Sequence, residues 1–203
     1  MRILLVGGFL GSGKTTVMLQ AAKYLTAVRR ETVAVIENEI GANGIDDKLF
    51  ANSGLKVKQL FGGCVCCQIS SDLISAVNEI HETVKPGCLM IEMTGLAYPS
   101  QTMKALKKYC TVYSALKSVT IVDRGRWSEL ITLLQPLILG QIEGSDLIIL
   151  NKMDIAGADI RKIKQDLQAI NERVKVMTTS AIQELSSEIL EEVVHFEYCR
   201  YRF

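Results

Sequence analysis

The sequence predicts an α/β fold, a doubly wound and mainly parallel sheet with helices on both faces. Short apolar runs rich in β-branched residues alternate with segments of helical period, which is the pattern of strands covered on both sides. A glycine-rich turn directly follows the first run, as it does where a parallel sheet binds phosphate. The six runs expected to form strands are 2–6, 32–36, 88–91, 118–122, 147–150 and 174–177.

The composition is that of one globular domain. The chain has 203 residues, 48% of them hydrophobic, and a formal net charge of +1, so we interpret 1–203 as a single domain. Lys and Arg are scattered, which argues against nucleic-acid and membrane partners, and no apolar run reaches the roughly 20 residues of a membrane span. Six unevenly spaced cysteines favour a reducing compartment. We therefore expect a cytoplasmic protein.

The turn after the first strand is a phosphate-binding loop. Its residues match the P-loop pattern completely and lead into a helical stretch over 17–28; they are Gly8, Phe9, Leu10, Gly11, Ser12, Gly13, Lys14 and Thr15. The glycines let successive backbone N–H groups surround a phosphate. Lys14 is expected to reach the β- and γ-phosphate oxygens, and Thr15 to hold Mg²⁺. A P-loop NTPase is predicted, with a ligand-free glycine turn as the alternative.

The segment 41–61 interrupts the rhythm of strands and helices with several glycines, and the alternation at 55–58 predicts an exposed or edge strand. Directly after it, Cys64, Cys66 and Cys67 lie within four positions. Thiolates are soft ligands that suit Zn²⁺ and, with less selectivity, Co²⁺ or Ni²⁺. No second cysteine pair completes a closed site, so an open, exchangeable metal site is favoured over redox chemistry or simple packing.

The following strands end in polar residues. Glu92 ends the run 88–91 and is expected to hold Mg²⁺ through water, while the N–H of Gly95 could contact a γ-phosphate. A solvated acid at a strand end is the alternative interpretation of Glu92. Further along, apolar residues spaced from Trp127 to Ile138 predict one helix that Pro136 bends.

The strand 147–150 leads into Asn151, Lys152 and Asp154, which predict recognition of a guanine base. A carboxylate at Asp154 can accept hydrogen bonds from N1–H and from the 2-amino group of guanine, whereas adenine presents an acceptor at N1 and no 2-amino donor. After the last strand, Ser180 and Ala181 could supply backbone donors to the base. A plain turn is the alternative for each loop.

Six motifs, taken together and in order, resemble those of the CobW-like metallochaperone GTPases, which are relatives of the nickel-insertion GTPases UreG and HypB. The motifs are VGGFLGSGKTT at 6–16, NEIG at 38–41 with GID at 44–46, GCVCC at 63–67, EMTGLAYP at 92–99, VD at 122–123 and NKMD at 151–154. The resemblance runs from residue 1 to about 181. Two departures stand out: Met93 replaces the usual Thr or Ser, and the sequence ends at Phe203, where family members continue into a second domain.

The resemblance implies slow hydrolysis of GTP to GDP, with Mg²⁺, coupled to delivery of a transition metal, Zn²⁺ or Co²⁺ above all, to a client metalloprotein. Thr16 joins the P-loop residues as a nucleotide ligand. Glu39 and Asp46 belong to a nucleotide-responsive switch and are candidate catalytic groups beside Lys14 and Glu92. The implied metal ligands are Cys64, Cys66 and Cys67.

Other functions stay open at this point. The same switch would serve an activator of a corrinoid enzyme or other metalloenzyme client, and a metal sensor or store would bind nucleotide without hydrolysing it. A small-molecule kinase would need an arginine-rich lid, for which Arg124 and Arg126 are too sparse. A nucleotide- or metal-dependent homodimer is plausible, and the tail 195–203 could add an edge strand or simply pack.

Overall fold

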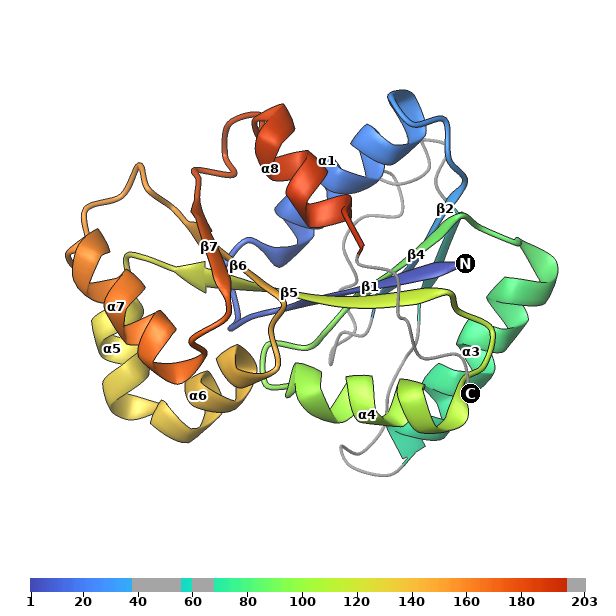
Figure 1. Cartoon of the computed structure of the whole chain (residues 1–203), viewed down its shortest axis with the longest axis horizontal. Helices are drawn as coiled ribbons and strands as arrows, with labels where there is room; N and C mark the ends of the chain where they lie inside the picture. Colours follow the sequence, from blue (N-terminus) through green and yellow to red (C-terminus); the bar gives the residue numbers. More distant parts are fainter. Residues whose placement is uncertain (38–55, 60–67, 197–203) are drawn as a thin grey trace.

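The computed structural model describes residues 1–37, 56–59 and 68–196, with the backbone alone at 56–59 and 68–70. These residues form three layers, a parallel sheet between two layers of helices (Figure 1). The doubly wound α/β fold and the P-loop NTPase architecture are thereby confirmed. None of the helices in the described ranges has the length and apolar character of a transmembrane span.

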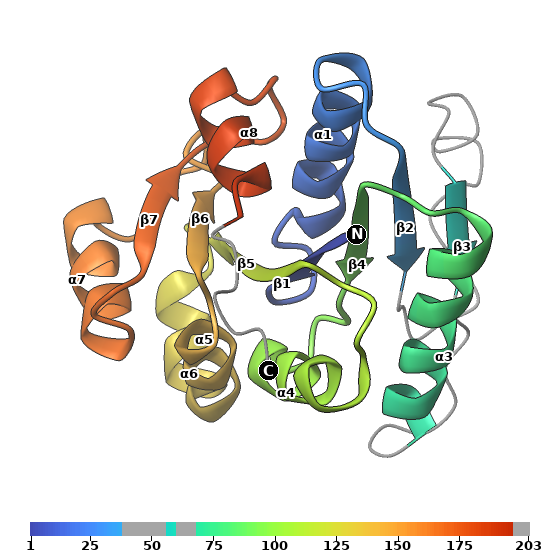
Figure 2. The same ribbon diagram turned by 45° about the vertical axis from the view of Figure 1, so that its right-hand side comes forward.

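The sheet has seven described strands in the order β3-β2-β4-β1-β5-β6-β7, and every neighbouring pair is parallel. The strands are β1 (Arg2–Gly7), β2 (Val33–Glu37), β3 (Lys56–Gln59), β4 (Cys88–Glu92), β5 (Ala115–Asp123), β6 (Leu147–Asn151) and β7 (Lys175–Thr178). The central strands are buried along almost their whole length, which explains their continuous apolar runs. Each of the six predicted runs forms a strand, and β3 is the predicted edge strand (Figure 2).

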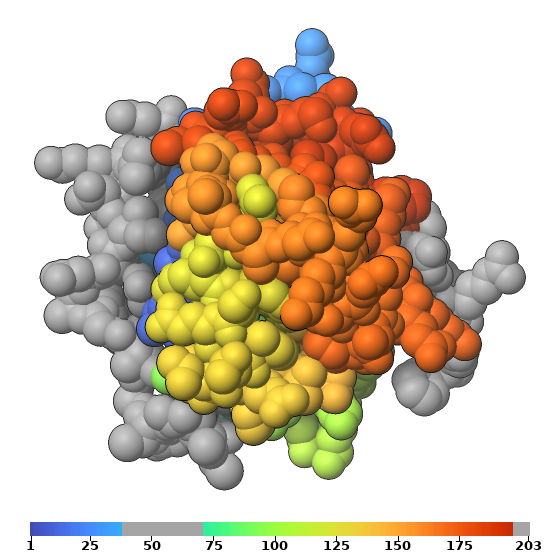
Figure 3. Space-filling model, turned by 90° about the vertical axis from the view of Figure 1, so that its left-hand side faces the viewer, coloured from blue at the N-terminus to red at the C-terminus, as the bar shows by residue number. Residues whose placement is uncertain are grey.

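Among the described residues, two helices cover one face of the sheet and five cover the other. The helices are α1 (Lys14–Ala27), α3 (Gln68–Thr83), α4 (Pro99–Tyr109), α5 (Trp127–Leu133), α6 (Gln135–Glu143), α7 (Ile160–Ile170) and α8 (Ser187–Val194). On one face, α1 and α8 pack against alternate residues of β1, β2, β4, β5 and β6. On the other, α3 and α4 share one core, and α5, α6 and α7 share a second with β6. Figure 3 shows the side of the molecule on which α5, α6 and α7, coloured yellow to orange, lie next to one another.

The predicted single helix from Trp127 to Ile138 is wrong, because the structure breaks it into α5 and α6. Leu134 lies between them with φ −127° and ψ 32°, outside the helical region. Pro136 lacks an N–H, so it cannot continue the hydrogen bonds of α5, and it fits instead in the first turn of a new helix. The proline therefore starts a helix at this point.

The register of the sheet places four strand ends side by side. Glu92 of β4 pairs with Val6 of β1 on one side and with Glu37 of β2 on the other, and Glu37 pairs in turn with Gln59 of β3. The carboxyl ends of parallel strands are where open α/β sheets bind ligands. The P-loop therefore starts at the same edge as the chain segments that follow β2 and β3.

Candidate functional site

The P-loop between β1 and α1 has the backbone that its glycines predict. Gly8, Gly11 and Gly13 have φ values of 130°, 70° and 99°, which side chains rarely tolerate. A Cβ on Gly8 would lie 2.2 Å from the carbonyl oxygen of Ile121, so the loop can lie against β5 only because this residue is glycine. The ammonium of Lys14 donates to the carbonyl of Phe9 across the loop at 3.3 Å. The loop thus closes around the position predicted to bind phosphate.

Thr15 and Glu92 come together at the start of α1. The Thr15 hydroxyl donates to both carboxylate oxygens of Glu92, at 2.7 and 2.9 Å. A hydroxyl and a carboxylate this close are oxygen ligands of the kind that Mg²⁺ prefers. The residues therefore fit an Mg²⁺ site, and the strand end of β4 supplies its charge.

Asn151 links the P-loop to the loop that follows β7. Its amide nitrogen donates to the carbonyl of Ser12 at 2.8 Å, and its amide oxygen accepts from the N–H of Ala181 at 2.8 Å. A Cβ on Gly13 would lie 2.4 Å from the same amide nitrogen, so this contact requires glycine there. Asn151 is 3% exposed and therefore fixes the spacing between the predicted phosphate and base sites.

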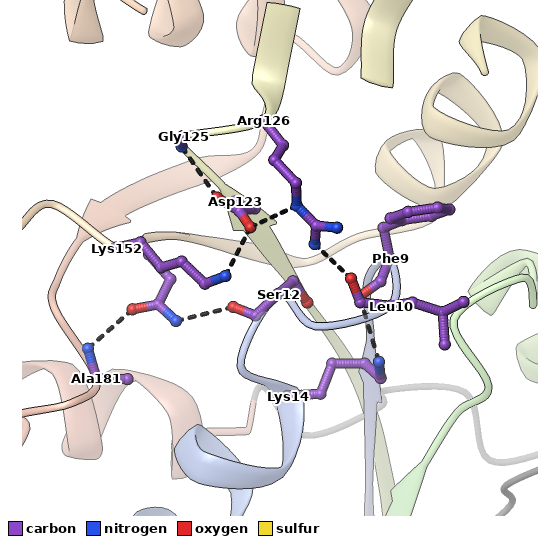
Figure 4. A network of polar contacts seen from close by, with 10 residues as sticks. Phe9, Leu10, Ser12, Lys14, Asp123, Gly125, Arg126, Lys152 and Ala181 are labelled. Carbon is purple, nitrogen blue, oxygen red and sulfur yellow. Dashed lines mark hydrogen bonds and ion pairs between the residues drawn. The ribbon is translucent and has the colours of Figure 1, made fainter. Parts of the chain in front are cut away.

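The carboxylate of Asp123, at the end of β5, forms ion pairs with two basic side chains of the site (Figure 4). Its Oδ2 accepts from Lys152 Nζ at 2.8 Å and from Arg126 Nε at 2.9 Å. Arg126 also donates to the carbonyl of Leu10 at the tip of the P-loop, and its guanidinium lies 5.5 Å from the centre of the Phe9 ring. The buried carboxylate of Asp123 thus positions both Lys152 of the Asn-Lys-Met-Asp motif and Arg126, which contacts the P-loop.

The electrostatics of Asp123 give a first prediction. Burial of the side chain, which is 2% exposed, would raise its pKa, but hydrogen bonds and charges from Lys152 and Arg126 outweigh burial and hold the pKa below its usual range. Because the folded pKa lies below the unfolded value of about 3.9, this carboxylate stabilises the protein fully above about pH 4, and its contribution is lost as pH falls through the folded pKa.

We expect Asp123→Asn to lower the free energy of unfolding by about 2 kcal/mol at pH 7, a value reduced because both cations are partly exposed. Urea unfolding at pH 7 and pH 3.5 measures it, and the gap between wild type and variant should narrow at the lower pH. The control Glu192→Gln removes a more exposed pair with Lys175 and should cost below about 1 kcal/mol. A gap that stays constant with pH would contradict the assignment.

Seven of the residues predicted to bind nucleotide line a cavity of about 900 Å³ between α1, the loop after β6 and the loop after β7, whereas Lys14 and Thr15 are not among its lining residues. Those that line it are Gly11, Gly13, Thr16, Asn151, Lys152, Asp154 and Ala181. Lys152 adopts a left-handed backbone with φ 63°, an uncommon conformation that turns the chain between Asn151 and Asp154. Asp154 is held to the loop after β7, because its N–H donates to the Ser180 hydroxyl at 2.9 Å.

The segment after β4 lies against the P-loop. A Cβ on Gly95 would lie 2.5 Å from Leu10 Cγ, and the carbonyl of Gly95 accepts from the buried side chain of Gln141 at 3.0 Å. Met93 donates its N–H to the carbonyl of Val6, and its side chain, 3% exposed, packs in the core under α3 and α4. Met93, which replaces the usual Thr or Ser, is therefore a buried apolar side chain.

The predicted transition-metal ligands Cys64, Cys66 and Cys67, and the switch residues Glu39 and Asp46, lie outside the described residues. Of the other cysteines, Cys88 and Cys110 are buried in the cores on the two faces of the sheet. Burial raises the pKa of the Cys88 thiol to about 12, which keeps it a thiol near neutral pH. No group of three potential metal-binding side chains occurs within 1–37 and 71–196.

Three residues of the site escape sequence reasoning. Asp123 belongs to a motif of the resemblance, but nothing in its pattern assigns it two cations. Arg126 is too isolated to suggest a role, and Gln20, which lines the cavity, sits in an ordinary helical stretch. The one available signal is an acid at the end of a predicted strand, which would single out Asp123.

Comparisons with known proteins agree with this geometry. A family model described as the nucleotide-binding domain of CobW, HypB and UreG matches residues 2–178. The zinc chaperone YjiA of Escherichia coli is 32% identical over 186 residues, covering 88% of this chain and 57% of YjiA. The zinc chaperone CobW of a Sinorhizobium species is 25% identical over 219 residues, covering 91% of this chain and 60% of that protein. The chain thus spans less than two thirds of these relatives.

Solved structures share the fold. HypB from Helicobacter pylori in complex with nickel has a TM-score of 0.67 at 18% identity, with 94% of this chain and 82% of that chain covered. The Zn(II)-bound YjiA GTPase from E. coli has a TM-score of 0.65 at 23% identity, with 95% and 61% covered. At these identities the similarity shows a common fold.

Proposed function

The chain belongs to the CobW/HypB/UreG family of nucleotide-binding proteins, and from this premise we propose that it is a metallochaperone that hydrolyses GTP slowly. It binds Zn²⁺ or Co²⁺ through the Cys-x-Cys-Cys motif at 64–67 and couples its nucleotide state to delivery of the metal to a client metalloprotein. The observation that carries the proposal is the convergence of the P-loop and the Asn-Lys-Met-Asp loop on one cavity.

Each part of the site has a task in this proposal. The loop N–H groups and Lys14 bind the phosphates and stabilise the charge that develops on the γ-phosphate. Thr15 and Glu92 would hold Mg²⁺, which when bound offsets the phosphate charge. Asp154 accepts from the guanine edge, and Glu39 and Asp46 are proposed to orient the attacking water.

The sheet register supports the coupling to metal. Glu92, which contacts Thr15, is next to Glu37, and Glu37 is next to Gln59. In the sequence, Glu39 of the switch lies two residues after Glu37 and Cys64 lies five residues after Gln59, and the strands that end at Glu37 and Gln59 both end at the phosphate edge. A γ-phosphate that fixes the switch can therefore change the arrangement of the thiolates, and by linkage the metal changes nucleotide affinity by the same factor.

A chelator-competition titration tests the coupling. Reduced protein is loaded with Mg²⁺ and either GDP or a non-hydrolysable GTP analogue, and Zn²⁺ and Co²⁺ affinities are measured. We expect the two nucleotide states to differ by about tenfold or more, which corresponds to about 1.4 kcal/mol of coupling.

The variant Cys66→Ala is the control, in which affinity and coupling should both be lost. Equal affinities in the two nucleotide states would show a static or redox site and would favour nucleotide-driven remodelling of a client. A metal store would differ again, because its metal binding would be coupled to nucleotide without turnover, so phosphate release from GTP is measured on the same samples.

A further inference from the structure

Gln20, on the second turn of α1, forms three hydrogen bonds with the loop between β7 and α8. Its Nε2 donates to the carbonyls of Ala181 and Gln183, both at 3.0 Å, and its Oε1 accepts from the N–H of Leu185 at 2.7 Å. The reversed amide would place an oxygen against two carbonyls, so the contacts fix its orientation. One side chain thus uses both ends to hold a stretch of five residues.

This loop contributes Ala181 to the lining of the cavity, as the loop after β6 contributes Asp154. Ala181 donates its N–H to Asn151, and Ser180 accepts from the N–H of Asp154, so the loop is tied to the proposed guanine site at two points. Gln20 also lines the same cavity as Asp154 and Ala181. The third attachment of the loop, through Gln20, comes from the helix that begins with the phosphate-binding Lys14.

We propose that Gln20 is a positioning residue that sets the guanine-binding loop relative to the P-loop and thereby determines affinity and selectivity for the base. The inference rests on the proposed binding of GTP and GDP and adds to it a residue outside the recognition motifs. The loop keeps other anchors without Gln20, because Ala181 and Leu185 are each 3% exposed and pack in the core under α1 and α8. Removing the amide should loosen the loop and leave the fold intact.

The test compares ligands that use different parts of the site. Binding of GDP, ADP and inorganic tripolyphosphate, each with Mg²⁺, is measured by calorimetry for wild type, Gln20→Ala and a matched control, Gln165→Ala. Gln165 is an exposed residue in the middle of α7. We expect Gln20→Ala to weaken GDP binding by about tenfold, to reduce the preference for GDP over ADP, and to leave tripolyphosphate within about twofold. The control should change none of these.

Two results would overturn the proposal: GDP affinity within twofold of wild type, or an equal loss for GDP and tripolyphosphate, which marks a general structural effect. A failure of the proposed function is distinct, because the wild type itself would then show no preference for GDP over ADP. Gln20→Glu provides a second variant should Gln20→Ala not fold. It keeps an acceptor for Leu185 but faces two carbonyls with a carboxylate, so GDP should again weaken by at least about tenfold.

Discussion

Asp154→Asn is expected to weaken binding of GDP by about 100-fold or more and to create a preference for xanthine nucleotides. The carboxylate of Asp154 lines the cavity and, in the proposed function, accepts two hydrogen bonds from guanine. An asparagine amide would turn its NH₂ group toward the 2-amino group, so two donors would face each other. Xanthine carries a carbonyl at that position and accepts from the new amide, which is why the discrimination reverses.

Calorimetric titration of GDP and XDP into both proteins measures this change. Asp72→Asn is a suitable control, because Asp72 is exposed on α3, away from the cavity. The control should bind GDP as the wild type does. If the Asp154 variant keeps its affinity for GDP, or loses GDP without gaining XDP, the carboxylate does not read the base edge and the assignment of Asp154 is wrong.

Gly8→Ala is expected to destabilise the fold by about 3 kcal/mol or more, a large share of the typical 5–15 kcal/mol of a domain. The residue has a φ of 130°, and a Cβ there would lie 2.2 Å from a backbone oxygen of β5. Backbone cannot move aside as a side-chain end can, so the P-loop must leave its place on the sheet. Nucleotide binding should be lost together with stability.

The variant Gly11→Ala separates the cost of the positive φ from the cost of the contact with β5. Gly11 also has a positive φ, of 70°, but the nearest atom to an added Cβ is the flexible end of Arg126 at 3.4 Å. We expect this variant to lose only about 1 kcal/mol, the cost of the backbone conformation. Urea unfolding of both variants measures the difference, and an equal loss in the two would rule out the contact with β5 as the cause.

Local patterns in the sequence predict much of the fold. Continuous apolar runs identify the strands because a parallel sheet is buried on both faces, and the alternating run before Gln59 identifies the edge strand. Helix α4 escapes the same reasoning, since Pro99 and Leu106 are its two fully buried residues and give too narrow an apolar stripe. The break at Leu134 is missed because a proline in the first turn of a helix and a proline that bends one look alike in sequence.

Some residues of the candidate site can be predicted from local sequence patterns and others cannot. Groups that act through the backbone or within one motif, such as Gly8, Lys14 and Asp154, can be predicted because the motif contains their physical reason. Gln20 and Arg126 cannot, since their contacts cross 161 and 116 residues of sequence and depend on how α1 and β5 pack. Long-range positioning residues carry no local pattern.

The strand order separates the residues proposed to bind the base from those proposed to bind the phosphates. Asp154 and Ala181 follow β6 and β7, while the phosphate edge and the entries to the switch and the cysteine motif follow β1, β4, β2 and β3 on the other side. In the proposed function, the base selects which nucleotide binds and the phosphates report its state, and the residues for the two tasks follow different strands of the sheet. If the proposed coupling holds, a variant that binds xanthine nucleotides would keep it, so a xanthine nucleotide added to a mixture would act on that one protein and on no GTPase that requires guanine.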